Sequence, residues 1–391
     1  MTIGILGGGQ LGYMLALAGY PLGLRFRFLD PSPEAPVGRI AQRVTAEYTD
    51  KVALDKFANG LEVVTYEFEN VPVEAAEFLA ERVPVYPPAS ALEQAQDRRR
   101  EKQLFRRLGI PTTEFAEVSG GLEFDAAIKT LGLPAVLKTC RMGYDGKGQW
   151  LLRTREDVEK TRKELPNAPL ILEKFVSFTR EVSLLGVRNR GGEIAFYPLV
   201  ENHHREGILR LSLAPAPNLS SASQQAAEEA GRKVLEALGY VGVLCIEFFE
   251  VHGRLLANEM APRVHNSGHW TIEGAVTSQF ENHLRAALGL PLGSTATMGH
   301  SAMLNLIGEL PVTEEVLKVR DSHLHLYGKE ARPGRKVGHV TVRADRIEKL
   351  QQRVAELPAF FHRPEFCLEK AQMERAPDQL KIHLSTNLSQ H

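Results

Sequence analysis

The sequence is poor in cysteine, has no long apolar run and carries almost no net charge. The three cysteines, Cys140, Cys245 and Cys367, are too few and too scattered for a disulfide framework or a four-ligand metal cluster, so we expect reduced thiols. The 47 basic and 48 acidic residues leave a formal charge of −1, which argues against a nucleic-acid partner bound through its phosphates. No apolar run is long enough to span a bilayer, which argues against a membrane partner.

The amino terminus also lacks a basic leader. Residues Met1–Leu6 run directly into a predicted strand and a glycine-rich turn, so we expect no signal peptide and a cytoplasmic location. The chain has 391 residues, of which 43% are hydrophobic and 24% charged, as in globular proteins. At about 150 residues per domain, this length predicts two or three domains.

Apolar runs alternate with helical patterns through residues 1–95. Ile3–Leu6, Leu24–Leu29, Leu61–Tyr66 and Val83–Tyr86 are apolar runs, and Leu11–Ala18 and Val73–Leu79 have helical spacing. This alternation predicts an α/β domain with a doubly wound parallel sheet.

The rest of the chain has a mixed, α+β pattern. We expect a basic helix over Asp97–Leu108, a helix over Ser220–Gly239 and a hairpin formed by Val241–Glu250 and Arg254–Met260. Further on, Ser301–Ile307 and His323–Tyr327 are predicted strands, followed by a basic turn over Lys329–His339.

Two glycine-rich segments could bind anions. Gly143–Gln149 follows an apolar run that ends in Lys138, so its backbone amides and lysine could contact a polyphosphate, although such a turn can also close a simple hairpin. Gly7, Gly9 and Gly12 have the spacing of the dinucleotide fingerprint, and Asp30 ends the next apolar run. A nicotinamide cofactor, another anion and a purely structural turn all remain open for this second segment.

Two acidic positions on the predicted hairpin suggest a metal site. If His252-Gly253-Arg254 forms a three-residue loop, Glu247 and Glu259 stand directly opposite, and two facing carboxylates repel unless a cation lies between them. A solvated pair on an exposed sheet is the alternative reading. Glu67, at the end of another strand, could accept from a hydroxyl or amine or could simply be solvated.

Two further loops gather polar donors. Pro262–His269 follows the hairpin and suits a small oxyanion, whereas zinc is disfavoured because Asn266-Ser267-Gly268 between His265 and His269 is poor helix material. Lys329–Lys336 carries four cations around a turn and could clamp a phosphate or form a solvated surface.

In order along the chain, these features resemble the ATP-grasp fold and, more closely, the 5-(carboxyamino)imidazole ribonucleotide synthase family of purine biosynthesis. The strings Ala261–Trp270 and Arg332–His339 carry most of the resemblance, with support from Gly9–Gly12, Gly143–Gln149 and Gly239–Val243. The resemblance covers roughly residues 1–345 and leaves the tail beyond Pro358 without a role. It implies a pre-ATP-grasp domain over 1–95, an ATP-grasp domain over 96–295 with lobes at about 110–175 and 176–295, and a carboxy-terminal domain over 296–391.

The resemblance also implies a reaction. Members of the family use ATP, magnesium and bicarbonate to carboxylate the amine of aminoimidazole ribonucleotide through carboxyphosphate, releasing ADP and phosphate. It further implies a homodimer.

Site residues follow from the resemblance position by position. ATP would contact Arg98, Lys138, Gly143, Tyr144, Asp145, Gly146, Lys147, Gly148, Gln149, Glu173, Lys174, Phe175, Val176, Glu181, His204, Asn258 and Glu259. Magnesium would lie between Glu247 and Glu259. The catalytic residues would be Tyr144, Asp145, Arg263, His265 and Asn266, and the ribonucleotide substrate would contact Gln10, Leu11, Glu67, Lys329, Arg335 and Lys336.

Three other functions compete with this one. A formate-using glycinamide ribonucleotide transformylase belongs to a related branch of the fold, but Tyr144-Asp145 and His265-Asn266-Ser267 match the bicarbonate enzyme better. An NAD-dependent oxidoreductase would explain Gly7–Gly12 but would leave the hairpin carboxylates unused. A non-catalytic nucleotide sensor is the third alternative.

Overall fold

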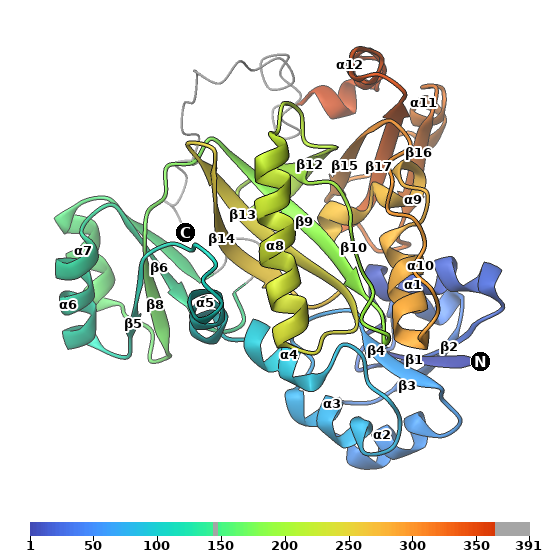
Figure 1. Ribbon diagram of the computed structural model, residues 1–391, viewed down its shortest axis with the longest axis horizontal. Helices are drawn as coiled ribbons and strands as arrows, with labels where there is room; N and C mark the ends of the chain where they lie inside the picture. The colour runs from blue at the N-terminus through green and yellow to red at the C-terminus, as the bar shows by residue number, and fades with distance from the viewer. Residues whose placement is uncertain (144–147, 364–391) are drawn as a thin grey trace.

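The computed structural model describes residues 1–143 and 148–363 of the chain. Within these residues the strands form three sheets, of four, nine and four strands. Figure 1 shows the amino-terminal sheet at the bottom, the large sheet in the centre and the smallest lobe standing apart at the left.

The amino-terminal sheet is parallel throughout and has the strand order β3-β2-β1-β4. Its elements are β1 (Thr2–Leu6), α1 (Gln10–Gly19), η1 (Tyr20–Leu22), β2 (Arg25–Asp30), η2 (Pro36–Arg39), β3 (Gln42–Thr45), α2 (Lys51–Ala58), β4 (Val63–Tyr66) and α3 (Val73–Ala80). The predicted parallel sheet is therefore confirmed. Strand β3 was not predicted because this edge strand is mostly polar, and the apolar run Val83–Tyr86 contributes only a bridge between Val85 and Val64.

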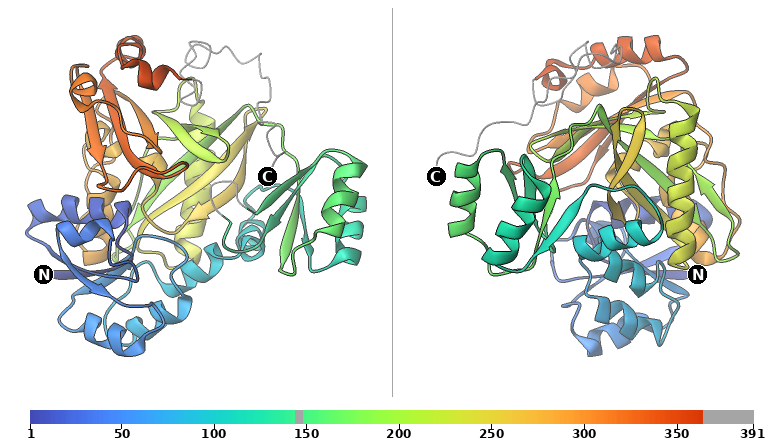
Figure 2. Two further views of the ribbon diagram at one scale, coloured as in Figure 1. Left: turned by 180° about the vertical axis from the view of Figure 1, so that it is seen from behind. Right: turned by 60° about the vertical axis from the view of Figure 1, so that its left-hand side comes forward.

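The second sheet, with the order β5-β8-β6-β7, forms a small lobe. It contains β5 (Phe115–Val118), α6 (Gly121–Leu131), β6 (Ala135–Thr139), β7 (Gln149–Leu152), α7 (Arg155–Lys163) and β8 (Leu170–Lys174). Phe124, Leu137 and Leu172 are buried in a core of its own. Figure 2 shows the lobe projecting from the rest of the molecule.

Two helices lead into this lobe, α4 (Ala89–Ala95) and α5 (Arg98–Arg107). The side chain of Asp97 accepts from the amide of Arg99 and caps α5, so the predicted basic helix is confirmed.

The central sheet has two buried faces. Its strands are β9 (Arg180–Arg188), β10 (Ile194–Phe196), β11 (Val200–Arg205), β12 (Ile208–Ala214), β13 (Gly242–Val251), β14 (Arg254–Ala261), β15 (His300–Ile307), β16 (Ser322–Leu326) and β17 (Lys336–Ala344). On one face Leu184 and Leu244 pack in the core beneath α8 (Ser221–Ala237), and on the other Leu185 and Val243 pack in the core that includes α10 (Gln279–Leu288) and α1. Burial on both faces explains the nearly continuous apolar run of β13.

The central sheet continues without a break into the carboxy-terminal part, because β12 pairs with β15 and β15 with β17. The remaining elements are η3 (Asn266–Gly268), α9 (Thr271–Gly274), α11 (Thr313–Leu317), α12 (Ile347–Ala355) and η4 (Ala359–His362). The expected basic turn was wrong at its end: β17 begins at Lys336, since Val337, Val340 and Val342 are buried in the core there. Across residues 1–143 and 148–363, no helix is both long and apolar enough to cross a membrane.

Candidate active site

Glu247 and Glu259 face each other across the β13–β14 hairpin, as the sequence predicted. The expected three-residue loop was wrong. The turn consists of His252 and Gly253, both with positive φ, as a two-residue turn of this kind requires. A bulge opposite Glu247 and Phe248 leaves Asn258 as an extra residue in β14, and that residue restores the pairing of the two glutamates.

The two facing carboxylates have different electrostatic surroundings. Burial and the neighbouring charge of Glu259 raise the pKa of Glu247 to about 7. Burial also acts on Glu259, but Arg98 donates from Nη1 to its Oε2 over 2.9 Å and lowers the pKa of this carboxyl. A proton or a cation beside Glu247 would therefore relieve the repulsion between the two carboxylates.

The chemistry of this pair fits a magnesium ion. Asn258 lies between the two carboxylates in sequence, and its Oδ1 is buried without a hydrogen-bond partner in the part of the chain that the structure describes. Among residues 1–143 and 148–363, no cluster of three or more His, Cys, Asp or Glu could hold a metal alone. Magnesium is commonly held by one or two carboxylates and completed by phosphate oxygens and water, which matches this donor set.

Lys138 lies in a buried ion-pair network next to the hairpin. Its Nζ is 2.9 Å from Oε2 of Glu173, and Nζ of Lys102 is 3.8 Å from the same oxygen. Burial opposes the charge of Glu173, but the two lysines outweigh it and lower the pKa of this carboxyl to about 2. Lys138 and Glu173, which were both predicted for the ATP site, are therefore brought together.

Two residues of this network were missed in the sequence. Glu101 accepts from the amide of Met260 over 2.6 Å, and burial together with Glu259 raises its pKa to about 8. Lys102 also donates to the carbonyl of Ala257 in β14. The available signal was their spacing of three and four residues after Arg98, which puts them on the same side of α5.

The segment predicted to meet adenine follows Glu173. The amides of Lys174 and Phe175 donate to the carbonyls of Glu114 and Pro134, so these two amides are already used within the small lobe. Contact between adenine and the Glu173–Val176 backbone stays a prediction.

Glu181 and His204 form an ion pair on neighbouring strands β9 and β11. Burial disfavours the imidazolium, but Glu181 and Glu247 outweigh it and raise the pKa of His204 to about 9. This pair and the hairpin carboxylates are thus electrostatically linked.

The loop after β14 places its three predicted donors in different environments. Arg263 donates from Nε to Glu69 of the amino-terminal region. Nε2 of His265 lies 3.5 Å from Oε1 of Glu247. Asn266 exchanges two hydrogen bonds with Asn305 of β15, at 2.9 and 2.8 Å. Of the three, His265 is the one in direct contact with the hairpin carboxylates.

The glycine turn before α1 is filled by carboxylates of the chain itself. Glu67 accepts from the amides of Gly9 and Gly12, and Asp30 accepts from the amide of Gly8 over 2.6 Å. A Cβ atom on Gly9 would lie 2.5 Å from Oε1 of Glu67, so the close approach requires glycine here. The amides of Gly8, Gly9 and Gly12 are therefore used within the chain and are not available for a pyrophosphate.

Of the remaining substrate candidates, Lys329 and Lys336 interact with other predicted site residues, whereas Leu11 and Arg335 contact other parts of the chain. Lys329 donates to Oε1 of Gln10, and burial lowers its pKa. Lys336 lies in β17, where its charge acts on His204 and Glu247. Leu11 is buried in the core, and Arg335 donates to the carbonyl of Glu330.

The central glycine segment is only partly described. Tyr144, Asp145, Gly146 and Lys147 lie outside the described residues. Gly148 has φ of +68°, and Gln149 pairs with Lys138 across β6 and β7. Arg98, which pairs with Glu259, also donates from Nη2 to the carbonyl of Gly143 over 3.4 Å. The start of the glycine segment therefore contacts the same arginine as the hairpin.

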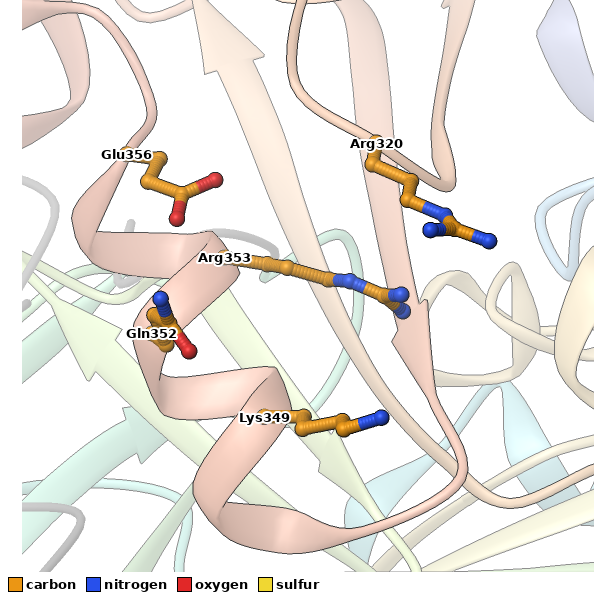
Figure 3. Close-up of a pocket in the computed structure, with 5 residues that line it drawn as sticks. All are labelled: Arg320, Lys349, Gln352, Arg353 and Glu356. Carbon is orange, nitrogen blue, oxygen red and sulfur yellow. The ribbon is translucent and has the colours of Figure 1, made fainter.

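A separate pocket of ≈ 260 Å³ lies at the opposite end of the central sheet (Figure 3). It is lined by Arg320, Lys349, Gln352, Arg353 and Glu356. Arg353 is already paired with Asp321 at 2.7 Å, and Glu356 offsets the charge of the other cations. This pocket does not adjoin the hairpin carboxylates.

Comparisons with known proteins agree with this arrangement. Three family models match the chain: ribonucleotide synthetase preATP-grasp domain over residues 1–96, ATP-grasp domain over 103–280 and phosphoribosylaminoimidazole carboxylase C-terminal domain over 301–353. The N5-carboxyaminoimidazole ribonucleotide synthase of Pseudomonas aeruginosa is 56% identical over 359 residues, which cover 92% of this chain and 99% of that relative.

Solved structures give the same result. The N5-carboxyaminoimidazole ribonucleotide synthetase of Thermus thermophilus is 63% identical, with a TM-score of 0.88 over 90% of this chain and 97% of that chain. The Aspergillus clavatus synthase, in complex with ADP and 5-aminoimidazole ribonucleotide, is 33% identical, with a TM-score of 0.84 over 90% of this chain and 96% of that chain. By sequence and by fold, the chain belongs to the N5-carboxyaminoimidazole ribonucleotide synthase family of ATP-grasp enzymes.

Proposed function

We propose that this enzyme carboxylates the amine of 5-aminoimidazole ribonucleotide with ATP and bicarbonate, releasing ADP and phosphate, as a step of purine biosynthesis. The observation that carries the proposal is the pair of facing carboxylates, Glu247 and Glu259, beside a donor loop that begins at Arg263. An ATP-grasp enzyme needs such a pair for magnesium, and a bicarbonate enzyme needs neighbouring donors for an unstable anion.

Several side chains serve the nucleotide. Lys138 and Arg98 supply positive charge for the phosphates, and the backbone after Glu173 meets the adenine. Glu181 accepts from the ribose hydroxyls, with His204 beside it. The other proposed ATP contacts are Gly143 to Gln149 and Asn258.

Glu247 and Glu259 are the proposed magnesium ligands. When bound, the ion would offset the negative charge that develops on the phosphates during phosphoryl transfer. Arg98 holds Glu259 in its ionised form, so a ligand oxygen is ready at this position.

The donor loop holds bicarbonate and its product. A bicarbonate oxygen attacks the terminal phosphorus of ATP, the bond to the bridging oxygen of ADP breaks, and carboxyphosphate forms. Arg263, His265 and Asn266 hold the anion while water is excluded. Carboxyphosphate then breaks down to carbon dioxide and phosphate. The substrate amine attacks the carbon dioxide, and the released phosphate or a nearby side chain takes the amine proton.

The ribonucleotide substrate lies against the amino-terminal region. Gln10, Leu11 and Glu67 support it, and Lys329, Arg335 and Lys336 bind its phosphate. The contacts of Glu67 with Gly9 and Gly12 indicate that this residue acts mainly by shaping the turn. Tyr144 and Asp145 are the proposed catalytic residues outside the described part of the chain.

We also propose the domain limits 1–95, 96–295 and 296–391, a homodimer and a cytoplasmic location. The family models end at residues 96 and 280 and resume at 301, which supports these limits. Light scattering of the purified protein tests the dimer.

The decisive experiment measures phosphate release with ATP and magnesium while bicarbonate and aminoimidazole ribonucleotide are each added or omitted. We expect full rates only with both, and a carboxylated product by mass spectrometry. Formate-dependent turnover of glycinamide ribonucleotide would favour the transformylase, NADH oxidation would favour an oxidoreductase, and ATP binding without turnover would favour a sensor.

A further inference from the structure

A chain of buried polar side chains runs through the central sheet and ends at His265. Ser212 of β12 donates to Oδ1 of Asn202 over 2.8 Å, and Asn202 of β11 donates from Nδ2 to Oγ of Ser183 over 2.9 Å. Ser183 of β9 donates to Oγ of Ser267 over 2.7 Å, and Oγ of Ser267 lies 2.8 Å from Nδ1 of His265. Ser183, Asn202, Ser212 and Ser267 are each at most 4% exposed.

The chain has a direction, because a serine hydroxyl carries a single proton. The amide of Asn202 donates to Ser183, so the proton of Ser183 is free to go to Ser267. The proton of Ser267 is then left for Nδ1 of His265. Sγ of Cys245, 3.9 Å from Oγ of Ser267, is a weak additional contact and leaves this order unchanged.

A second donor points to the same ring nitrogen. The backbone amide of Ser267 lies 3.3 Å from Nδ1 of His265, since the histidine side chain caps the short helix η3. A backbone N–H can only donate, so it fixes Nδ1 as an acceptor independently of the hydroxyl chain. A proton on Nδ1 would oppose both donors.

We propose that Ser267, supported by Ser183, Asn202 and Ser212, fixes His265 as the neutral tautomer that carries its proton on Nε2. Nε2 faces the hairpin, 3.5 Å from Oε1 of Glu247. In this tautomer His265 presents an N–H to an oxygen in the site, and it has no free lone pair on that side. His265 therefore donates a hydrogen bond to the bicarbonate-derived anion and does not take the proton of the substrate amine.

This role deepens the proposed function and rests on it. Ser267 is a positioning residue, since it acts through His265 and has no substrate contact of its own. Its effect is on turnover, because an anion formed during the reaction gains the hydrogen bond, while ATP binding is left largely unchanged.

The test reads the tautomer directly. The intact protein is labelled with ¹⁵N-histidine at neutral pH, and the His265 signals are assigned from the difference spectrum of His265→Gln. We expect the Nε2 signal at the position of a protonated nitrogen and the Nδ1 signal at that of an unprotonated one. A proton on Nδ1 in the wild-type protein would overturn the proposal.

Ser267→Ala should produce a mixture of tautomers and lower kcat about tenfold, with the KM for ATP changed less than about twofold. Ser183→Ala, which leaves the Ser267 hydroxyl in place, should have a smaller effect in the same direction. If Ser267→Ala fails to fold, the wild-type spectrum and Ser183→Ala carry the test. An unchanged tautomer and kcat in the folded Ser267→Ala variant would contradict it.

Ser301→Ala is the matched control. Ser301 is also fully buried, in β15, and its hydroxyl has no hydrogen-bond partner among the described residues. We expect wild-type kcat and tautomer from this variant, and an equal loss would show that buried serines act here only through packing. The spectrum needs no turnover, so failure of this inference is distinguishable from absence of carboxylase activity in the wild-type protein.

Discussion

Two carboxylate sites, a buried one in the amino-terminal turn and a partly exposed one in the hairpin, differ in what surrounds them. In the amino-terminal turn, both oxygens of Glu67 accept backbone N–H groups, from Gly9 and Gly12. In the hairpin, Glu247 faces another carboxylate, and the imidazole of His265 lies 3.5 Å from it. The oxygens of Glu67 are hydrogen-bonded by the chain itself. In the hairpin Arg98 pairs with Glu259, and a proton or a cation from outside would stabilise Glu247.

This difference separates a structural motif from a functional one. The glycine spacing of the first site left a cofactor, another anion and a structural turn open. The amides of Gly9 and Gly12 donate to Glu67, and the amide of Gly7 donates to the carbonyl of Leu29. The second site was predicted from the facing positions of Glu247 and Glu259, and these two like charges repel each other. The hydrogen-bond partners of the carboxylates therefore distinguish the two sites better than the glycine motif does.

The largest expected effect comes from removing the charge of a third carboxylate, that of Glu173, which forms ion pairs with Lys138 and Lys102. Glu173→Gln leaves Lys138 and Lys102 buried without their anionic partner, and we expect the free energy of unfolding to fall by about 3–5 kcal/mol. Urea denaturation measures it. Glu114→Gln, which removes a surface ion pair with Lys174, is the control, and an equal loss there would show that burial of the network does not matter.

Glu247→Gln should lower the activity of the enzyme and raise the stability of its metal-free form. We expect turnover to fall about 100-fold, since one of the two proposed magnesium ligands is lost. The metal-free protein should become more stable at pH 8 by up to about 3 kcal/mol, because the raised pKa of Glu247 makes its ionised form unfavourable in the fold.

The size of this gain in stability depends on pH. A carboxyl whose pKa is raised to about 7 in the fold destabilises the protein as pH rises from the pKa of the unfolded state through 7. The gain from Glu247→Gln should therefore be small at pH 5, where Glu247 keeps its proton. Urea denaturation at pH 5 and pH 8 without metal checks both values. Glu250→Gln, on the same strand but paired with Arg180, should leave the magnesium requirement unchanged.

The same substitution in the amino-terminal turn should have the opposite sign. Glu67→Gln turns an N–H donor toward Gly9 or Gly12, and we expect a loss of about 1–3 kcal/mol in the free energy of unfolding. Glu62→Gln, an exposed residue beside the same strand, should change little. A gain in stability from Glu67→Gln would remove the contrast between the two sites.

The smallest expected effect involves His283, which joins the two regions. Its ring nitrogens contact Oγ1 of Thr65 in β4 at 2.8 Å and the amide of Val243 in β13 at 3.1 Å, and burial lowers its pKa to about 4. As pH falls, His283 is protonated first in the unfolded state, where it has the ordinary histidine pKa of about 6.5. Stability is therefore lost between about pH 6.5 and 4.

Between pH 7.5 and 5.5 this loss should amount to about 1 kcal/mol for His283 alone. His283→Gln should reduce the pH dependence of unfolding by that amount, as measured by urea denaturation at the two pH values. The exposed His323 gives the control variant His323→Gln, which should keep the wild-type pH dependence.

Local patterns predicted most of the fold. The helix expected over Ser220–Gly239 spans Ser221–Ala237 with Ser220 as its cap, because its spacing and cap residue are local signals. The bulge at Asn258 was not predictable, since the hairpin sequence does not reveal where an extra residue is accommodated. Glu67 lies 58 residues from Gly9, so no local pattern could show that it fills the turn. Glu101 and Lys102 look like helix surface until α5 packs against β14.

The sheets also determine where the molecule can change shape. Lys138 and Glu173 belong to the sheet of the small lobe, and Glu247 and Glu259 belong to the central sheet. Within either sheet, ladder hydrogen bonds fix the spacing of these side chains. A change in the distance between Lys138 and the two glutamates would therefore involve the connections between the sheets, residues 108–114 and 175–179, and the contacts of α5 with β14.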